Sequence, residues 1–330
     1  MPFRATVASR RRLEVVTEQF PGTWSVFDST MAATPTDVIY VMRSTPDWSA
    51  QALYTWSVTT QTYTYVAGGT TGYVDGTGAS ASFGNFIWSM VWNDVMNAIV
   101  VADDSRIRVI TPGGVVTTLA GDGLSPTSTH DGTGTGARFG HISAIAVVPS
   151  NGNIVLGEYP QFTLRVVTPL GVVTTLAGPG TSISPHPPAL DGTGSAARFG
   201  EIIALAVFPS SGVIAVVDTC SIRLVTPSGV VTTLAGNGDP GHVDGPGTIA
   251  RFATTYGSAA ICILPKSEHI VLADGDIGIR LITKDGFVTT LVNGVTSIDS
   301  PYPPYSLWPL SDKEILVSNG DSIVTTVTIV

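Results

Sequence analysis

The polar residues most able to do chemistry stand at matching positions of a repeated segment. Each copy contains a phenylalanine, and the residue two positions later is Asn85, His141, Glu201 or Thr254. Because these groups differ while the frame around them repeats, we interpret them as candidate ligand-binding residues at one common rim. His141 and Glu201 also offer an imidazole nitrogen and a carboxylate, which Zn²⁺ and Ca²⁺ accept as ligands. The sequence places no third ligand beside them.

Other catalytic chemistry finds little support in the sequence. The chain contains no His-Glu-x-x-His, Gly-x-Ser-x-Gly or Gly-x-x-x-x-Gly-Lys motif, which are signatures of zinc enzymes, serine hydrolases and nucleotide-binding loops. The two cysteines, Cys220 and Cys262, are too few for a disulfide framework, although one bridge between them is compatible with the sequence. We therefore assign no catalytic residue and favour a protein that is not an enzyme.

Charged residues recur at fixed spacings. One set, with pairs seven residues apart, consists of Asp131 and Arg138, Asp191 and Arg198, and Asp244 and Arg251. A second set consists of Asp103 and Arg108, Asp218 and Arg223, Asp274 and Arg280, and Glu158 and Arg165. We interpret both as structural ion pairs, the first capping a Gly-rich turn and the second crossing a turn between strands, worth about 0.5 kcal/mol each if exposed. Ligand binding is the alternative for the first set and calcium binding for the second, but no Asp-x-Asp-x-Asp-Gly run supports calcium.

Composition restricts the class of partner. The 330-residue chain is 43% hydrophobic and 12% charged, with a formal net charge of -9 at pH 7. The negative charge argues against nucleic acid, whose phosphates are bound by clustered Lys and Arg. No apolar run approaches the roughly 18 residues needed to cross a bilayer, so we predict no membrane span. Few cysteines and no Asn-x-Ser/Thr sequon favour an intracellular location, whereas the Thr-rich, charge-poor composition would suit the cell exterior.

An internal repeat determines the fold class. The phrase Gly-Val-Val-Thr-Thr-Leu begins at Gly114, Gly171 and Gly229, and Gly286 begins a fourth copy with Phe in place of the first Val, a period of about 57 residues. Short apolar runs bounded by turn signals predict four strands per copy, in one case 142–148, 154–157, 164–168 and 172–176. Strands that are apolar on both faces, such as 99–102, must lie between neighbouring sheets. Radial stacking of four-stranded antiparallel sheets is an all-β fold, the β-propeller.

The repeat predicts six blades in a closed ring. Their expected ranges are 24–66, 67–119, 120–176, 177–234, 235–291 and 292–330. The last blade lacks a fourth strand, and the segment Leu13-Glu-Val-Val-Thr17 echoes the fourth strand of the other blades. We therefore expect residues 11–18 to complete the last blade, which would remove the open sheet edges and make residues 1–330 a single domain.

A fixed cassette joins each fourth strand to the next blade. It reads Asp-Gly-Thr-Gly from Asp75, Asp131 and Asp191 and Asp-Gly-Pro-Gly from Asp244, with a phenylalanine eight residues after each Asp. Together with Val-Thr-Thr-Leu-Ala-Gly, Ala-Arg-Phe and a later Ile-Arg, this pattern resembles the NHL-repeat propellers over residues 66–291. The resemblance implies a six-bladed β-propeller. The copies are divergent, because the Asn-His-x-Ile-Arg stretch of that family stands here without its histidine.

The segments between Ala-Gly and Asp-Gly differ in length from copy to copy. Since they form the same connection of each blade, we expect them on one face, where propellers carry functional loops. They hold His130, His186 and His242, and the last blade carries Tyr302 and Tyr305 in a Pro- and Tyr-rich stretch. We interpret these residues as candidate partner contacts. The Tyr-rich stretch has the alternative role of stabilising the last blade.

Three functions are compatible with these observations. A rigid frame with unequal loops favours a non-catalytic, monomeric propeller that binds a protein or peptide and holds no cofactor. A second hypothesis is a metal-assisted lyase or hydrolase with Ca²⁺ or Zn²⁺ at the mouth of the central channel, at His141 and Glu201, which resembles the sites of amidating lyases or lactonases. A third is a receptor for a small ligand or glycan that uses Tyr302, Tyr305 and His186.

Overall fold

The computed structural model describes most of the chain. The described residues are 31–33, 38–44, 50–57, 62–85, 87–124, 129–180, 189–254, 259–275, 278–293, 306–318 and 324–329. They divide between two compact units: an N-terminal unit, within Glu14–Leu156 and Val166–Thr174, and a C-terminal unit, within Gly157–Arg165 and Thr175–Val330. In this part of the chain the regular structure is β-strand, apart from four short 3-10 turns.

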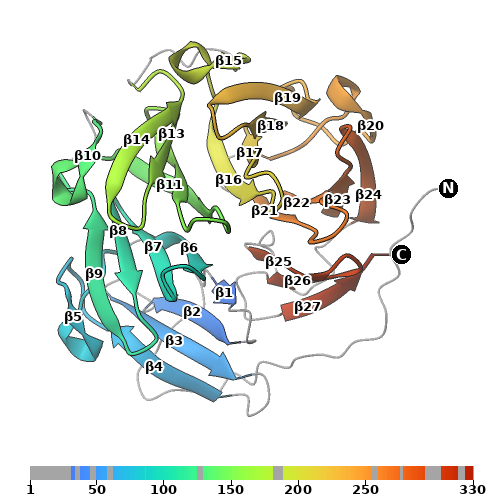
Figure 1. The fold of residues 1–330 in the computed structure, drawn as a ribbon. Coiled ribbons are helices and arrows are strands. Elements are labelled where there is room, and N and C mark those ends of the chain that lie inside the picture. The colour runs from blue at the N-terminus through green and yellow to red at the C-terminus, as the bar shows by residue number, and fades with distance from the viewer. Residues whose placement is uncertain are drawn as a thin grey trace. The chain divides into compact units, whose positions relative to one another are not determined.

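Two sheets belong wholly to the N-terminal unit (Figure 1). The first has the order β1-β2-β3-β4 and consists of β1 (Met31–Ala33), β2 (Ile39–Ser44), β3 (Gln51–Ser57) and β4 (Thr62–Gly68). The second has the order β5-β9-β8-β7-β6 and consists of β5 (Gly76–Thr77), β6 (Ile87–Asn93), β7 (Ala98–Asp103), β8 (Arg106–Ile110) and β9 (Val115–Ala120), with η1 (Gly78–Ser80) after β5.

A third sheet has strands in both units. Its order is β10-β14-β13-β12-β11, with β10 (Gly132–Thr133), η2 (Gly134–Gly136), β11 (His141–Val147), β12 (Ile154–Tyr159), β13 (Thr163–Val167) and β14 (Val172–Ala177). The four long strands begin and end within two residues of the predicted ranges, because the turn signals around them are strong.

Three sheets belong to the C-terminal unit. One has the order β15-β19-β18-β17-β16, with β15 (Gly192–Thr193), η3 (Gly194–Ala196), β16 (Ile202–Val207), β17 (Ile214–Asp218), β18 (Ser221–Val225) and β19 (Val230–Gly236). The next has the order β20-β24-β23-β22-β21, with β20 (Gly245–Pro246), η4 (Gly247–Ile249), β21 (Ala259–Ile263), β22 (Ile270–Asp274), β23 (Gly278–Ile282) and β24 (Phe287–Asn293). The last consists of β25 (Ser306–Ser311), β26 (Glu314–Ser318) and β27 (Val324–Thr328), in that order.

The repeat has one more strand than the sequence predicts. In each five-stranded sheet the Gly-Thr or Gly-Pro of the cassette is a two-residue strand that pairs antiparallel with the fourth long strand, as Gly76 pairs with Val116 and Gly192 with Val231. The prediction of four strands was therefore incomplete. The cassette covers the outer edge of the sheet, so it protects an edge that would otherwise be open to pairing with another chain.

Packing within each unit follows from strands that are apolar on both faces. Strands β7, β17 and β22 are buried along their whole length. In the N-terminal unit β6 and β11 lie side by side, and in the C-terminal unit β16 packs against β21 and β21 against β25. Buried apolar clusters fill the space between successive sheets, for example Ile107, Phe139 and Leu156. This stacking of sheets through their first strands is propeller-like.

The glycine that opens each Val-Thr-Thr strand has a steric role. Gly114 has φ 77° and Gly229 has φ 82°, in the left-handed region. A Cβ at Gly114 would lie 2.6 Å from the carbonyl oxygen of Val66, and one at Gly229 2.6 Å from that of Leu176. The repeat keeps glycine here because the turn meets the backbone of the preceding fourth strand.

Several predictions fall outside the described residues. They include the closing segment 11–18, His186, Tyr302 and Tyr305. Cys220 and Cys262 are free and buried, so the compatible disulfide between them is not formed. None of the described residues belongs to a helix long and apolar enough to cross a membrane.

Candidate functional site

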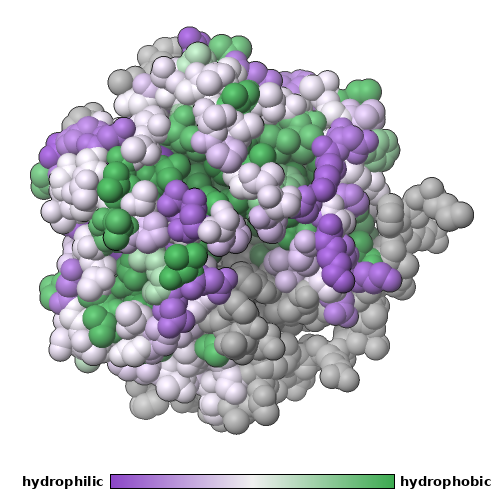
Figure 2. Space-filling view, in the orientation of Figure 1, coloured by the Kyte–Doolittle hydropathy of each residue, from purple (hydrophilic) through white to green (hydrophobic). Residues whose placement is uncertain are grey.

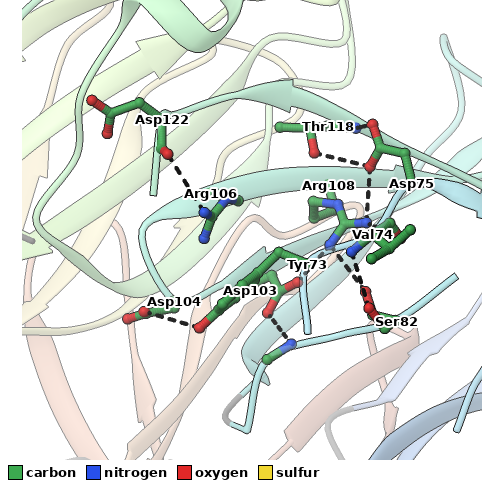
Figure 3. A network of polar contacts seen from close by, with 11 residues as sticks. Tyr73, Val74, Asp75, Ser82, Asp103, Asp104, Arg106, Arg108, Thr118 and Asp122 are labelled. Atoms are coloured by element: carbon green, nitrogen blue, oxygen red, sulfur yellow. Dashed lines mark hydrogen bonds and ion pairs between the residues drawn. The ribbon is translucent and has the colours of Figure 1, made fainter. Parts of the chain in front are cut away.

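A buried arginine on the third long strand anchors the repeated motifs. Arg108 of β8 is fully buried, and its two terminal nitrogens pair with Asp103 at 2.8 Å and with Asp75 at 2.9 Å. Asp75 also accepts hydrogen bonds from the backbone N–H and the hydroxyl of Thr118. The guanidinium carbon lies 5.6 Å from the ring centre of Phe83. One side chain therefore ties together the cassette, the turn after β7 and the outer strand (Figure 3).

The same arrangement recurs in the C-terminal unit. Arg223 pairs with Asp218 and Asp191, both at 2.7 Å, and Arg280 pairs with Asp274 at 2.6 Å and Asp244 at 2.8 Å. Arg165 pairs with Glu158 at 3.0 Å. The predicted cross-turn ion pairs are thus confirmed. They are buried, since the side chains of Asp103, Asp218 and Asp274 are 0% exposed, so the value given for exposed pairs does not apply to them. Such pairs hold a frame together and belong to the fold.

The predicted pairs seven residues apart were wrong in the two copies of the C-terminal unit. Asp191 pairs with Arg223 in place of Arg198, and Asp244 with Arg280 in place of Arg251. Arg251 instead donates to the carbonyl oxygens of Thr248, Ile249 and Ala250. In the N-terminal unit Arg138 pairs with Asp122 at 2.7 Å.

Burial shifts the pKa of the inner carboxylates. Desolvation raises the pKa of Asp103 to about 6 against the opposing charge of Arg108, and it raises the pKa of Asp218 to about 6 against Arg223. The pKa of Asp274 is raised for the same reason. These carboxylates are held by buried arginines, so we regard them as structural.

A second polar group lies on the N-terminal unit, and all of its members except Arg138 depart from the repeat. We call it the Tyr73 cluster, and it consists of Tyr73, Asp104, Arg106, Asp122, Arg138 and His141. Its members come from the segment before β5, the β7–β8 turn, the start of β8, the segment after β9, the segment after η2 and the start of β11. Figure 3 shows Tyr73, Asp104, Arg106 and Asp122 beside the Arg108 network.

Tyr73 connects a guanidinium to a carboxylate. The guanidinium carbon of Arg106 lies 4.0 Å from the centre of the Tyr73 ring, within the range of a cation–π contact. The Tyr73 hydroxyl donates to Asp104 Oδ2 at 3.3 Å. Burial raises the pKa of Tyr73, and the charges of Asp104 and Asp103 raise it further, so the hydroxyl stays protonated and remains a donor.

Backbone geometry positions Asp104 and Arg106. Asp104 has φ 59°, a left-handed conformation that Asp tolerates in tight turns. Its carbonyl oxygen accepts the N–H of Ile142 at 3.2 Å, which brings His141 close to the Asp104 carboxylate. Arg106 packs on Gly123, where a Cβ would lie 1.7 Å from the guanidinium carbon. Glycine at 123 is therefore required for this position of Arg106.

Asp122 and His141 of the cluster are partly buried. Burial opposes ionisation of Asp122, but the N–H of Leu124 and the side chain of Arg138 donate to its carboxylate, and its pKa is lowered overall. Burial lowers the pKa of half-buried His141, and the nearby Asp104 carboxylate opposes that shift. His141 is therefore mostly neutral at pH 7 and can donate from one ring nitrogen and accept at the other.

The structure brings two predicted site residues to the Tyr73 cluster. His141 is a member, and exposed Asn85 follows Gly84, where a Cβ would lie 2.7 Å from the Tyr73 ring. The backbone of exposed His130 pairs with that of Arg138 in both directions. Binding by these residues remains a prediction.

The other predicted residues that the structure describes lie in the C-terminal unit. Glu201 is half-buried, and its backbone exchanges hydrogen bonds with Thr219. Thr254 is fully buried, and its hydroxyl donates to the Thr219 carbonyl oxygen, so the fold uses this side chain. His242 is exposed near Asp274.

Sequence reasoning missed Tyr73, Asp104, Arg106 and Asp122. The sequence did contain a signal, because equivalent positions of the other copies hold different residues. The equivalents of Arg106 are Thr163, Ser221 and Gly278, and those of Tyr73 are Thr129, Ala189 and His242. Departures from a repeat mark residues that the repeated frame does not need. Their proximity, however, depends on turns from four segments.

Metal binding finds no further support in the described part of the chain. No three His, Cys, Asp or Glu side chains gather there as metal ligands. The predicted Ca²⁺ or Zn²⁺ site at His141 and Glu201 therefore remains a hypothesis. Strongly hydrophilic residues on the face shown in Figure 2 form small separate groups, in keeping with the low charge of the chain.

Comparison with known proteins identifies the fold. No protein-family model matches the chain, and no curated protein matches it in sequence. An auxiliary nutrient binding protein from Bacteroides thetaiotaomicron is similar in structure with TM-score 0.59 and 12% identity, over 93% of this chain and 70% of that one. A gluconolactonase from Xanthomonas campestris has TM-score 0.58 and 12% identity over 100% and 95% of the two chains. Virginiamycin B lyase from Staphylococcus aureus has TM-score 0.52 and 11% identity over 92% and 96%.

These likenesses support an all-β, propeller-like fold. They do not show that the chain belongs to the NHL-repeat family. At such low sequence identity, the functions of these proteins cannot be transferred to this chain.

Proposed function

We propose that the protein is a propeller-type binding protein for a small, hydroxylated ligand, and that the Tyr73 cluster is its binding site. The observation that carries this proposal is the gathering of non-repeating polar groups on a repeated frame. A ring, a guanidinium and a carboxylate meet at Tyr73, Arg106 and Asp104. The frame beneath them is held rigid by the buried Arg108 network.

The chemistry of the cluster suits hydroxyl groups. A carboxylate such as Asp104 accepts hydrogen bonds from hydroxyls, guanidinium groups such as Arg106 and Arg138 donate them, and neutral His141 can do either. The Tyr73 side chain beside these groups is 40% exposed, so a ligand can reach it. A small polar ligand would use all of these groups, whereas a large partner would need a wider surface.

The comparisons leave room for this proposal. The structurally similar proteins include a nutrient binding protein as well as a lactonase and a lyase, so binding and catalysis both occur on this fold. Binding of a protein or peptide through the variable loops stays a prediction, because His186, Tyr302 and Tyr305 lie outside the described residues.

We further propose that the chain forms one six-bladed, NHL-type ring over residues 1–330, closed by residues 11–18. The order β25-β26-β27 supports this, since the place beside β27 is taken by no described strand. Deletion of residues 1–18 should lower the unfolding temperature if this segment supplies the missing strand. An unchanged unfolding temperature would contradict the closure.

The binding proposal is tested by thermal unfolding and ligand-observed NMR with a panel of monosaccharides, sugar acids and polyols. We expect at least one compound to bind the wild type and raise its unfolding temperature. Asp104→Asn should abolish the effect. Asp94→Asn is the matched control, because Asp94 lies at the opposite end of the same sheet, in the β6–β7 turn, and accepts a hydrogen bond from Trp92. If no compound binds, or if both variants bind equally, the proposal is wrong.

A further inference from the structure

Arg106 differs from the other guanidinium groups around it. Arg108 is paired with Asp103, and Arg138 with Asp122. Arg106 has no carboxylate at ion-pair distance among the described residues. Its Nη2 donates one long hydrogen bond of 3.4 Å to the Asp122 carbonyl oxygen. Its Nη1 is buried and has no hydrogen-bond partner in the described part of the chain.

Such a donor is costly to bury without an acceptor. A buried N–H that loses water and gains no partner carries its full desolvation cost, and the cost is larger for a charged group. Any group that brings an acceptor to this nitrogen recovers that free energy. A carboxylate is the natural acceptor, because its two oxygens match the planar, forked donors of a guanidinium.

Tyr73 makes two contacts with its neighbours in the cluster. Its ring lies over the Arg106 guanidinium at 4.0 Å, and its hydroxyl reaches the Asp104 carboxylate at 3.3 Å, as Figure 3 shows. That hydrogen bond is longer than the usual range for O–H···O contacts, and the side chain is 40% exposed. The Tyr73 side chain, which covers the charge of Arg106, is therefore held in place only weakly.

We propose that Tyr73 is a displaceable cover and that the ligand carries a carboxylate beside a hydroxyl group. The ligand carboxylate takes the place of the ring on Arg106, and the ligand hydroxyl takes the place of the tyrosine hydroxyl on Asp104. This inference rests on the proposed function and adds the chemical class of the ligand.

Asp104 makes the site selective. A simple anion brought to Arg106 would be repelled by the carboxylate of Asp104, since like charges at short range oppose binding. A hydroxyl between them turns that repulsion into a hydrogen bond. A neutral sugar satisfies Asp104 but offers the Arg106 Nη1 only a hydroxyl oxygen, a weaker acceptor than a carboxylate. A hydroxylated carboxylate satisfies both groups.

The test compares galacturonate with galactose, which has a CH₂OH group where galacturonate has the carboxylate. Both are titrated against the full chain by ligand-observed NMR at pH 7. We expect galacturonate to bind at least about tenfold more tightly than galactose, since a hydrogen bond between charged groups contributes at least that factor. Arg106→Gln should remove this preference, so that galacturonate and galactose bind about equally. Arg198→Gln, at an exposed arginine of the C-terminal unit, is the control and should keep the preference.

Variants of Tyr73 should change the affinity for galacturonate in the opposite direction to Arg106→Gln. Tyr73→Ala should raise the affinity for galacturonate several-fold, and Tyr73→Phe, which loses the tie to Asp104, should raise it less. A merely structural Tyr73 would lower affinity when truncated, so a loss would overturn the role of the cover.

The two proposals fail in different ways. If galactose and galacturonate bind equally and Arg106→Gln has no effect, the carboxylate inference is wrong and the binding function stands. If galacturonate fails to bind while a neutral compound of the panel binds, the inference is again wrong. If no compound binds, both proposals are wrong.

Discussion

Removal of the Arg108 side chain should be among the most destabilising substitutions in the N-terminal unit. Arg108→Met keeps much of the length of the side chain and deletes the charge. It removes the ion pairs to Asp103 and Asp75 and the hydrogen bonds to the carbonyl oxygens of Ser82 and Val74. Asp103 is then left as a buried carboxylate that keeps the hydrogen bond from the N–H of Gly84. We expect a loss of about 3–5 kcal/mol in the free energy of unfolding.

The size of this effect should depend on pH. Asp103 has a pKa of about 6 with Arg108 present, and loss of the guanidinium charge raises that pKa further. Since each unit of pKa corresponds to about 1.4 kcal/mol, the defect of Arg108→Met should be about 1 kcal/mol smaller at pH 5 than at pH 7, because protonated Asp103 needs no counter-charge.

A double-mutant cycle isolates the charge from the packing. Asp103→Asn in the Arg108→Met background should recover part of the loss, because it removes the uncompensated charge. Urea unfolding followed by tryptophan fluorescence measures all four proteins, and Arg198→Met is the control at an exposed arginine. A loss below about 1 kcal/mol for Arg108→Met, or strictly additive effects in the cycle, would refute the view that a buried ion pair holds the cassette.

Three further outcomes follow from the same geometry. Asp75→Ala should cost about 1 kcal/mol in urea unfolding, much less than loss of Arg108, because the Asp75 side chain is 47% exposed. Gly123→Ala should displace Arg106 and weaken ligand binding at the Tyr73 cluster, whereas Gly134→Ala, with a similar positive φ and open space around its Cβ position, should cost about 1 kcal/mol of stability and leave binding intact. Between about pH 4 and pH 6 the folded protein keeps protons on Asp103 and Asp218 that the unfolded chain has released, so their contribution to the free energy of unfolding is full below pH 4 and is lost as the pH rises through 6. The slope of the urea midpoint against pH in this window should be smaller for Asp103→Asn, and an unchanged slope would contradict the raised pKa.

The strands could be predicted because their signals are local. The runs around 154–157 and 172–176 are apolar, β-branched and bounded by Pro and Gly turns, and β12 and β14 lie where those runs do. The short strands β5 and β15 could not be predicted from a Gly-Thr dipeptide. They exist because the cassette meets the outer strand of a sheet that is formed by residues far along the chain.

The ion pairs show the limit of spacing as a guide. Asp218 and Arg223 face each other across a tight turn, so five residues suffice to predict the pair. Asp191 and Arg198 are almost as close in sequence, and the backbones of Leu190 and Arg198 pair, yet the Asp191 side chain binds Arg223 because β15 lies beside β19. The number of residues between an Asp and an Arg does not determine which strands lie side by side in the sheet.

The candidate site depends still more on tertiary structure. His141 and Asn85 were found because they occupy matching positions of the repeat. Tyr73 and Asp104 are 31 residues apart, and their contact requires that the segment before β5 lie over the β7–β8 turn. Repetition can reveal which residues the frame does not need. It cannot say which of them meet.

The sequence by itself determined the strands, the turns and the period, because each is set by the conformational preference and hydrophobicity of a few adjacent residues. Tertiary structure alone decided which carboxylate each arginine binds, how deeply that pair is buried and which exposed side chains gather beside it. The reason is that these properties depend on contacts between segments tens of residues apart, and such contacts form only when the sheets pack against one another.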